Sequence, residues 1–144
     1  MMRLNASASE IMQKHNVHAC TDITGFGLLG HGLEMAQGNT VRIEIFSTNV
    51  PCFEHVLNLV RKKTYTRAYL ANTKFLEGSV TFGTAVPEEL RHVLMEAETS
   101  GGLLFAVPES EAEGALAELH AGDCPEAAVV GQVSASSKAE IHVR

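Results

Sequence analysis

The chain of 144 residues carries 17 acidic and 11 basic side chains, a formal net charge of −6 and a hydrophobic fraction of 45%. This length can bury the core of one domain, so we expect a single domain spanning residues 1–144. The net charge argues against a nonspecific nucleic-acid-binding protein, and no apolar stretch reaches the roughly 20 residues that span a bilayer. We therefore predict neither nucleic acid nor membrane as a partner. Three cysteines without a CxxC pair indicate reduced thiols and a cytoplasmic location.

Hydrophobic spacing predicts the secondary structure in chain order. We expect a helix over 6–16, a strand over 17–22, a helix over 26–37, a strand over 41–46 and a helix over 51–60. Residues 64–86 are rich in Thr, Gly and Asn, and predict a long functional loop with short elements. A helix should begin at Pro87, followed by a strand over 101–107, a helix over 108–120, and a strand pair over 127–133 and 139–143. This order indicates an α+β fold, a mixed sheet covered by helices.

The most informative segment is 21–31, with the sequence TDITGFGLLGH. It puts Asp22 beside a glycine-rich turn that opens an apolar helix. Backbone N–H groups at a helix N-terminus face anions, and a nearby carboxylate can hold the Mg²⁺ of a bound phosphate. Aspartate also caps helices well, so the residues alone leave two roles open for Asp22, helix cap and metal ligand. Segment 99–102 is either a second anion-facing turn or a tight turn into a buried strand.

Residues 25–30 also satisfy the pattern G-x-G-x-x-G, with Glu44 near the position of a ribose-binding acid. We do not favour a dinucleotide site, because the preceding strand is short and polar, whereas a central parallel strand is an apolar run. His31 and Glu34, spaced i and i+3, are interpreted as a surface or capping pair.

A second group of residues could suggest a metal or reactive-thiol site. His15, His18 and Cys20 form H-x-x-H-x-C, which we interpret as coincidence because a structural zinc site needs a fourth ligand. We expect Cys20, Cys52 and Cys124 to be buried thiols, because none has a base nearby in the sequence.

Two segments carry a resemblance to a known family. Residues 21–31 resemble the opening motif of the C-terminal domain of selenophosphate synthetase (selenide, water dikinase), and 98–104, ETSGGLL, is similar to the QTSGGLL segment of that family. The resemblance implies the fold of the C-terminal domain of aminoimidazole-ribonucleotide synthetase. It also implies a Mg²⁺–ATP site, in which Asp22 is a metal ligand and the turn is shaped by Thr21, Thr24, Gly25 and Gly27.

The reaction implied by the resemblance converts ATP, selenide and water into selenophosphate, AMP and phosphate. In that family an N-terminal domain supplies the Cys or selenocysteine, the catalytic lysine and most of the metal-binding aspartates. None of these is in the chain, so we expect no catalytic residue here, an inactive isolated domain and a homodimeric intact protein. The family's middle segment Gly-Gly-Thr-x-Arg-Asn corresponds to 64–72, TYTRAYLAN, where only Asn72 is its candidate remnant.

Two alternative functions stay open from the sequence. One is a domain of another ATP-using enzyme of the same superfamily, such as a purine-synthesis enzyme, a thiamine-phosphate kinase or a hydrogenase-maturation enzyme. The other is a stand-alone binding or dimerisation module without catalysis. The second alternative predicts that Asp22→Asn has no effect on function.

Overall fold

The computed structural model describes residues 4–144, and its elements mix helices and strands along the whole chain. In order they are α1 (Ala6–Met12), β1 (Ala19–Asp22), α2 (Gly27–Asn39), β2 (Val41–Ile45), the 3-10 turn η1 (Ser47–Asn49), α3 (Val56–Arg61), α4 (Ala68–Leu76), β3 (Val80–Phe82), α5 (Glu88–Met95), β4 (Leu103–Ala106), α6 (Glu109–Ala121), β5 (Gly131–Ala135) and β6 (Glu140–Val143). The predicted α+β class is confirmed.

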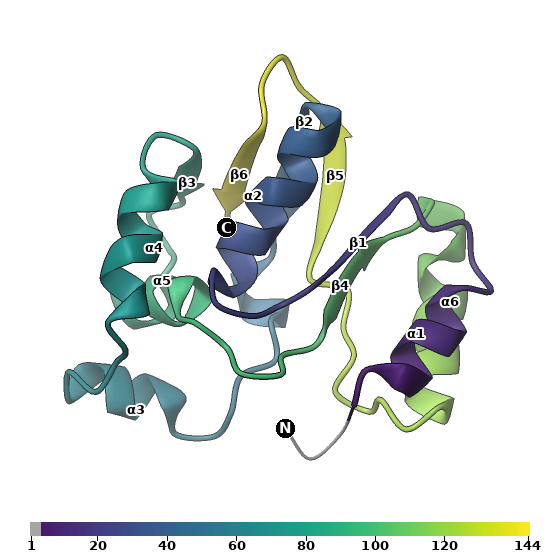
Figure 1. Cartoon of the computed structure of the whole chain (residues 1–144), viewed down its shortest axis with the longest axis horizontal. Coiled ribbons are helices and arrows are strands. Elements are labelled where there is room, and N and C mark those ends of the chain that lie inside the picture. Colours follow the sequence, from purple (N-terminus) through teal and green to yellow (C-terminus); the bar gives the residue numbers. More distant parts are fainter. Residues whose placement is uncertain (1–3) are drawn as a thin grey trace.

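The strands form two sheets (Figure 1). The larger sheet has the order β3-β6-β2-β5, in which β6 runs parallel to both β3 and β2, while β5 runs antiparallel to β2. The smaller sheet pairs β1 with β4 in antiparallel register, with Asp22 opposite Leu103. The smaller sheet matters for function because it brings two distant segments of the chain together.

Helix α2 covers one face of the larger sheet and builds the core there. Three of its apolar side chains form a buried stripe: Leu29 and Ala36 are 0% exposed and Leu33 is 1% exposed. These side chains belong to one cluster with the strand residues Ile141 and Val143. Burying a leucine side chain contributes about 1.5–3 kcal/mol, so this stripe fixes the position of α2 against the sheet.

The other face of the larger sheet is polar. Arg42 donates from Nε and Nη2 to Oε1 of Glu140, at 2.9 and 2.7 Å, and Lys138 Nζ lies 3.2 Å from Oε2 of the same carboxylate. The hydrogen bonds from Arg42 are the main reason why the pKa of Glu140 falls to about 2. Glu44 is part of this face too, bonded to Gln132 at 2.6 Å, so it supports strand pairing.

The predicted elements of the middle of the chain need correction. The helix expected from residue 51 begins only at Val56, because His55 before it has a left-handed backbone with φ of 67°. The helix expected over 6–16 ends at Met12. The prediction of a long loop over 64–86 was wrong, because nine of these residues form α4 and three more form β3.

The predicted pairing of the last two strands was also wrong. Both strands exist, but β2 lies between them: Ile43 is opposite Val133 of β5 on one side and Ile141 of β6 on the other. The first of them begins at Gly131 rather than at residue 127. Segment 136–139 therefore crosses over β2 instead of closing a hairpin.

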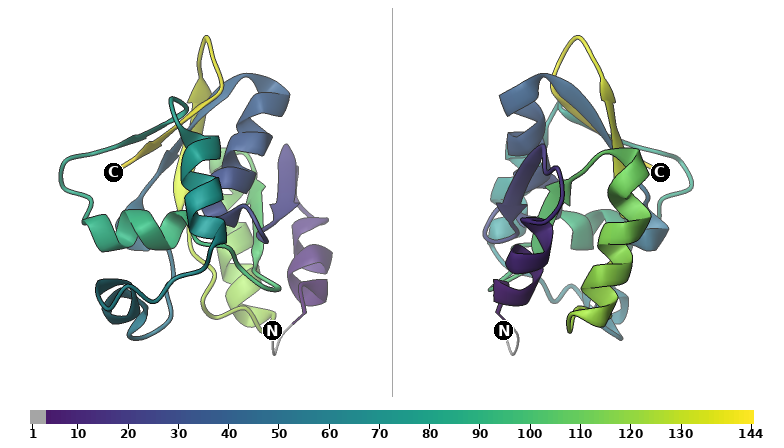
Figure 2. Two further views of the ribbon diagram at one scale, coloured as in Figure 1. Left: turned by 60° about the vertical axis from the view of Figure 1, so that its left-hand side comes forward. Right: turned by 90° about the vertical axis from the view of Figure 1, so that its right-hand side faces the viewer.

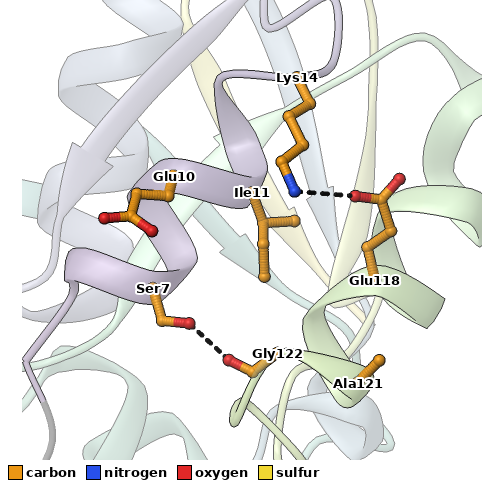
Figure 3. Close-up of a pocket in the computed structure, with 7 residues that line it drawn as sticks. All are labelled: Ser7, Glu10, Ile11, Lys14, Glu118, Ala121 and Gly122. Atoms are coloured by element: carbon orange, nitrogen blue, oxygen red, sulfur yellow. Dashed lines mark hydrogen bonds and ion pairs between the residues drawn. The ribbon is translucent and has the colours of Figure 1, made fainter.

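Helices α1 and α6 lie side by side beyond the smaller sheet (Figures 1 and 2). A surface pocket of about 380 Å³ opens between them (Figure 3). Lys14 Nζ lies 3.7 Å from Oε2 of Glu118 across this pocket, and the Ser7 hydroxyl donates to the carbonyl of Gly122. These contacts hold the two helices together at the surface, away from the turn that opens α2.

Candidate functional site

The two segments that carry the family resemblance lie against each other. The N–H of Ile23 donates to the carbonyl of Gly102 at 2.9 Å, and the N–H of Gly101 donates back to Ile23 at 3.1 Å. One step further, the N–H of Glu98 donates to the carbonyl of Thr24 at 2.9 Å. The β1–β4 pairing thus continues past both strand ends, and it joins the turns at 24–27 and 98–102 into one site.

Asp22 lies at the end of β1 and is exposed. The capping role considered from the sequence is wrong, because α2 begins at Gly27 and its N-cap residue, Phe26, makes no side-chain capping bond. Within residues 4–144 the Asp22 carboxylate has no hydrogen bond or ion pair.

Alternation along the strand places the neighbours of Asp22. Ile23 is buried at 4% exposure, whereas Asp22 and Thr24 on either side of it are exposed and half-buried. Side chains alternate between the two faces along β1, which ends at Asp22, so Asp22 and Thr21 project to opposite faces. Thr24 follows the end of the strand, and its hydroxyl lies 3.0 Å from Nε2 of His31.

Gly25 and Gly27, the two predicted glycines of the turn, lie in different surroundings. Gly27 has φ of 67°, and a Cβ there would lie 2.5 Å from the carbonyl oxygen of Glu96. Its N–H donates to the carbonyl of Thr24 at 3.0 Å, which closes the turn. A Cβ on Gly25 would meet nothing within 4 Å, so Gly25 faces open space. Gly27 thus fixes the turn, and Gly25 leaves room for a ligand beside it.

Asn72, the candidate remnant of the family's middle segment, holds the turn from α4. Its side-chain amide donates to the carbonyl of Gly25 at 3.0 Å and to that of Met95 at 2.9 Å. Asn72 is 3% exposed; its bond to Met95 is buried, and its bond to Gly25 is partly buried. Phe75 of the same helix stacks on Phe26, with ring centroids 5.5 Å apart. Asn72 thereby ties three parts of the molecule together: the turn, α4 and the end of α5.

His31 connects the turn to the first helical turns of α2. Its Nε2 lies 3.0 Å from the Thr24 hydroxyl and its Nδ1 lies 2.9 Å from Oε2 of Glu34. Interpreting His31 and Glu34 as a surface or capping pair was wrong for the histidine, which is only 8% exposed. The i, i+3 spacing pointed to the contact with Glu34, but it contained no signal for the contact with Thr24.

The segment 98–102 contributes a second turn and a carboxylate. Ser100 has φ of 52°, and a Cβ on Gly101 would lie 2.4 Å from the carbonyl oxygen of Ile23 and 2.6 Å from Oε2 of Glu98. Burial raises the pKa of Glu98, while nearby His31 acts in the opposite direction. The pKa of the Cys52 thiol is raised mainly by partial burial of the thiol, and the Glu98 carboxylate raises it further. Gly101 therefore allows this turn to approach the Asp22 strand closely.

The remaining predictions concern cysteines and histidines. The expectation of buried thiols was wrong for Cys20 and Cys52, which are exposed, while Cys124 is intermediate. His15 lies 3.4 Å from Glu111 and 3.6 Å from Glu118, both on α6. Residues 4–144 contain no group of three or more His, Cys, Asp or Glu arranged to hold a metal ion. In the same range no helix combines the length and apolar character needed to cross a membrane.

The site offers oxygen donors on one side and an open position beside a helix start. The Asp22 carboxylate and the Thr24 hydroxyl are hard ligands of the kind that Mg²⁺ prefers. Gly25 lets an anion approach the turn without a side chain in its way. Asp22 supplies a carboxylate here, and Mg²⁺ sites usually add substrate phosphates and waters to one or two carboxylates. The residues present therefore fit part of a metal–phosphate site.

Comparison with known proteins finds similar sequences among selenide, water dikinases. The chain is 37% identical over 133 residues to a selenide, water dikinase of Clostridium botulinum, covering 92% of the chain and 38% of that relative. It is 41% identical over 133 residues to a selenide, water dikinase of Pelobacter propionicus, with the same coverage. An alignment to the selenide, water dikinase of Caldanaerobacter subterraneus spans all 144 residues at 38% identity and covers 42% of that protein. The chain thus spans about two fifths of the length of these relatives.

Solved structures support the fold. A crystal structure of the hydrogenase maturation protein HypE matches with a TM-score of 0.60 at 23% identity, over 94% of this chain and 36% of that one. A structure of HypE in complex with ATP matches with a TM-score of 0.59 at 21% identity, over 94% of this chain and 35% of that one. The family described as "AIR synthase related protein, C-terminal domain" matches residues 1–144. The chain belongs to this family, as the resemblance of its two turns had implied.

Proposed function

We propose that this chain forms the C-terminal domain of a selenide, water dikinase, which converts ATP, selenide and water into selenophosphate, AMP and phosphate. The observation that carries the proposal is the meeting of the two turns, 24–27 and 98–102, beside an Asp22 carboxylate that has no partner within residues 4–144. The similarity to selenide, water dikinases over 92% of the chain supports the same assignment. The nucleophile and further metal ligands belong to the part of those relatives that this chain does not span.

In this proposal the chain completes a Mg²⁺–ATP site. Asp22 would hold the metal, and the turn shaped by Thr24, Gly25 and Gly27, with the backbone of Thr21 before it, would lie along the phosphates. When bound, Mg²⁺ neutralises charge on the phosphate oxygens during phosphoryl transfer. The chain's own contribution is to orient the carboxylate and to keep side-chain volume out of the space beside Gly25.

The experiment is a selenide-dependent assay of AMP formation by the native polypeptide that contains this chain. Asp22→Asn should reduce AMP formation by at least tenfold, because the amide keeps the shape but loses the charge that binds the metal. Glu113→Gln, an exposed carboxylate of α6, is the matched control and should keep full activity. Equal activity of Asp22→Asn and wild type would contradict the proposal and favour a module without catalysis.

The second candidate is another ATP-using enzyme of the superfamily, and the observation that favours it is the fold match to HypE with ATP. ATP turnover that does not respond to selenide would support this candidate. The proposed domain organisation is tested by the mass of the native protein in its source cells. A band well above 15.5 kDa would support an additional N-terminal domain, and a band at 15.5 kDa would contradict it. The proposed homodimer and cytoplasmic location are tested by sedimentation and by cell fractionation.

A further inference from the structure

The side chains Thr24, His31 and Glu34 form a chain of contacts that the proposed metal site does not yet explain. Thr24 Oγ1 lies 3.0 Å from Nε2 of His31, and Nδ1 of His31 lies 2.9 Å from Oε2 of Glu34. The Phe26 ring is tilted against the imidazole, with centroids 5.4 Å apart, and the side chain of His31 is 11% exposed. A hydroxyl, an imidazole and a carboxylate in this sequence make an ordered hydrogen-bond relay.

The protonation pattern of this relay follows from what each group can donate. An ionised Glu34 carboxylate can only accept, so the hydrogen in its contact with His31 lies on Nδ1. A neutral imidazole with its hydrogen on Nδ1 has an unprotonated Nε2, which accepts from the Thr24 hydroxyl. Thr24 has a single hydroxyl hydrogen, and this relay uses it. Its oxygen is left with lone pairs alone.

We propose that Glu34 and His31 are positioning residues that fix the Thr24 hydroxyl as an acceptor, in the turn that follows Asp22. Thr24 then favours a cation or an N–H group and disfavours direct contact with a phosphate oxygen, which would need a donor. Thr24 comes two residues after Asp22, the exposed carboxylate at the end of β1. The identity of that ligand as Mg²⁺ rests on the proposed function, whereas the hydrogen-bond pattern does not.

Glu34 can act in this way because it lies at the edge of the solvent. Its side chain is 46% exposed, compared with 11% for His31, so the carboxylate is in contact with water while the imidazole is shielded. The other acidic group near His31 is Glu98, and burial raises its pKa. Among residues 4–144, Thr24 and Glu34 contact the ring nitrogens of His31, so Glu34 sets the position of the ring hydrogen.

The test is imidazole NMR on the full 144-residue chain with ¹⁵N-labelled histidine and no metal or nucleotide. The chain has seven histidines, and His31→Gln assigns the signals of His31. At about pH 8, wild type should show hydrogen on Nδ1 of His31 and none on Nε2. Glu34→Ala should move the two ring-nitrogen signals of His31 towards each other, and Glu34→Gln, whose amide oxygen still accepts, should restore them.

The control is Glu54→Ala. Glu54 is 85% exposed and lies 3.1 Å from Nε2 of His55, so this change should shift the signals of His55 and leave those of His31 unmoved. Hydrogen on Nε2 of His31 in wild type, or signals of His31 that do not respond to Glu34→Ala, would overturn the proposal.

A second measurement concerns the metal and separates this inference from the proposed function. In the native polypeptide, calorimetry with Mg²⁺ and a non-hydrolysable ATP analogue should show affinity lowered about 10–100-fold by Glu34→Ala, the range found for groups that orient metal ligands. Glu34→Gln and Thr24→Ser should stay close to wild type, and Thr24→Val should match Glu34→Ala. Loss of Mg²⁺ binding in Asp22→Asn with wild-type affinity in Thr24→Val would overturn the role of Thr24 and keep the proposed function. No Mg²⁺ binding in wild type would overturn the proposed function, while the NMR result decides the relay.

Discussion

Asn72 provides a direct test of how α4 holds the turn at Gly25. Replacing it by leucine keeps similar volume but removes the amide that donates to the carbonyls of Gly25 and Met95, at 3.0 and 2.9 Å. The bond to Met95 is buried, and a buried acceptor without a partner costs about 1–3 kcal/mol. The bond to Gly25 is partly buried, so water can replace it and the loss is about 0.5–1.5 kcal/mol.

Together these losses predict that Asn72→Leu lowers the free energy of unfolding by about 2–4 kcal/mol. For a chain of this size, about 3 kcal/mol corresponds to a fall in Tm of roughly 10 °C. The assay is urea unfolding and thermal melting followed by circular dichroism. The control is Asn58→Leu on α3, whose exposed side chain should change stability by no more than about 0.5 kcal/mol. If Asn72→Leu and Asn58→Leu had the same small effect, the amide of Asn72 would not be what holds the turn.

Three further predictions concern the same turns and the polar sheet face. Gly27→Ala should lower the free energy of unfolding by at least about 2 kcal/mol, because alanine is strained at positive φ and its Cβ would meet the carbonyl of Glu96. Gly25→Ala is the control and should change stability little. Equal thermal melts of the two variants would contradict this prediction. The pKa of Glu140, about 2 against an ordinary 4.5, favours folding above pH 4.5, and this contribution is lost as the pH falls towards 2. Glu140→Gln should therefore be less stable than wild type at neutral pH and approach it in acid, by urea unfolding across pH; a difference independent of pH would refute the reasoning. Because the pKa of Glu98 is raised, its ionised form opposes folding, and Glu98→Gln should raise Tm at neutral pH but not in acid.

The parts of the fold that could be predicted are those determined by residues close together in the sequence. Helix α2 is visible in the sequence because its apolar side chains recur at helical spacing and glycines precede it. Helix α4 is not, because the contacts that bury it join Asn72 to Met95 and Gly25, which are 23 and 47 positions away. The same holds for β5 and β6, since each pairs with β2, which lies near the other end of the sequence.

The candidate site divides in the same way. Asp22, Gly25 and Gly27 could be predicted as a group, because they lie close together in one distinctive motif. Residue types alone could not distinguish a cap from an exposed carboxylate, since that depends on where α2 begins. The contact of Thr24 with His31 was missed for a related reason. It needs the turn at Gly27, which brings Thr24 next to His31 of α2, and this geometry exists only in the folded chain.

The strand order of the larger sheet has a consequence for the synthesis of the protein. Strand β2 is made before both of its neighbours, which come about 90–100 residues later, and at ordinary translation rates of about 5–20 residues per second this is a delay of several seconds. During that time Ile43 and Ile45 have no sheet to join, although α2 can already cover part of them. The chain therefore emerges from the ribosome with its central strand unpaired. Nascent chains of this protein should need a chaperone more than its completed, folded form does.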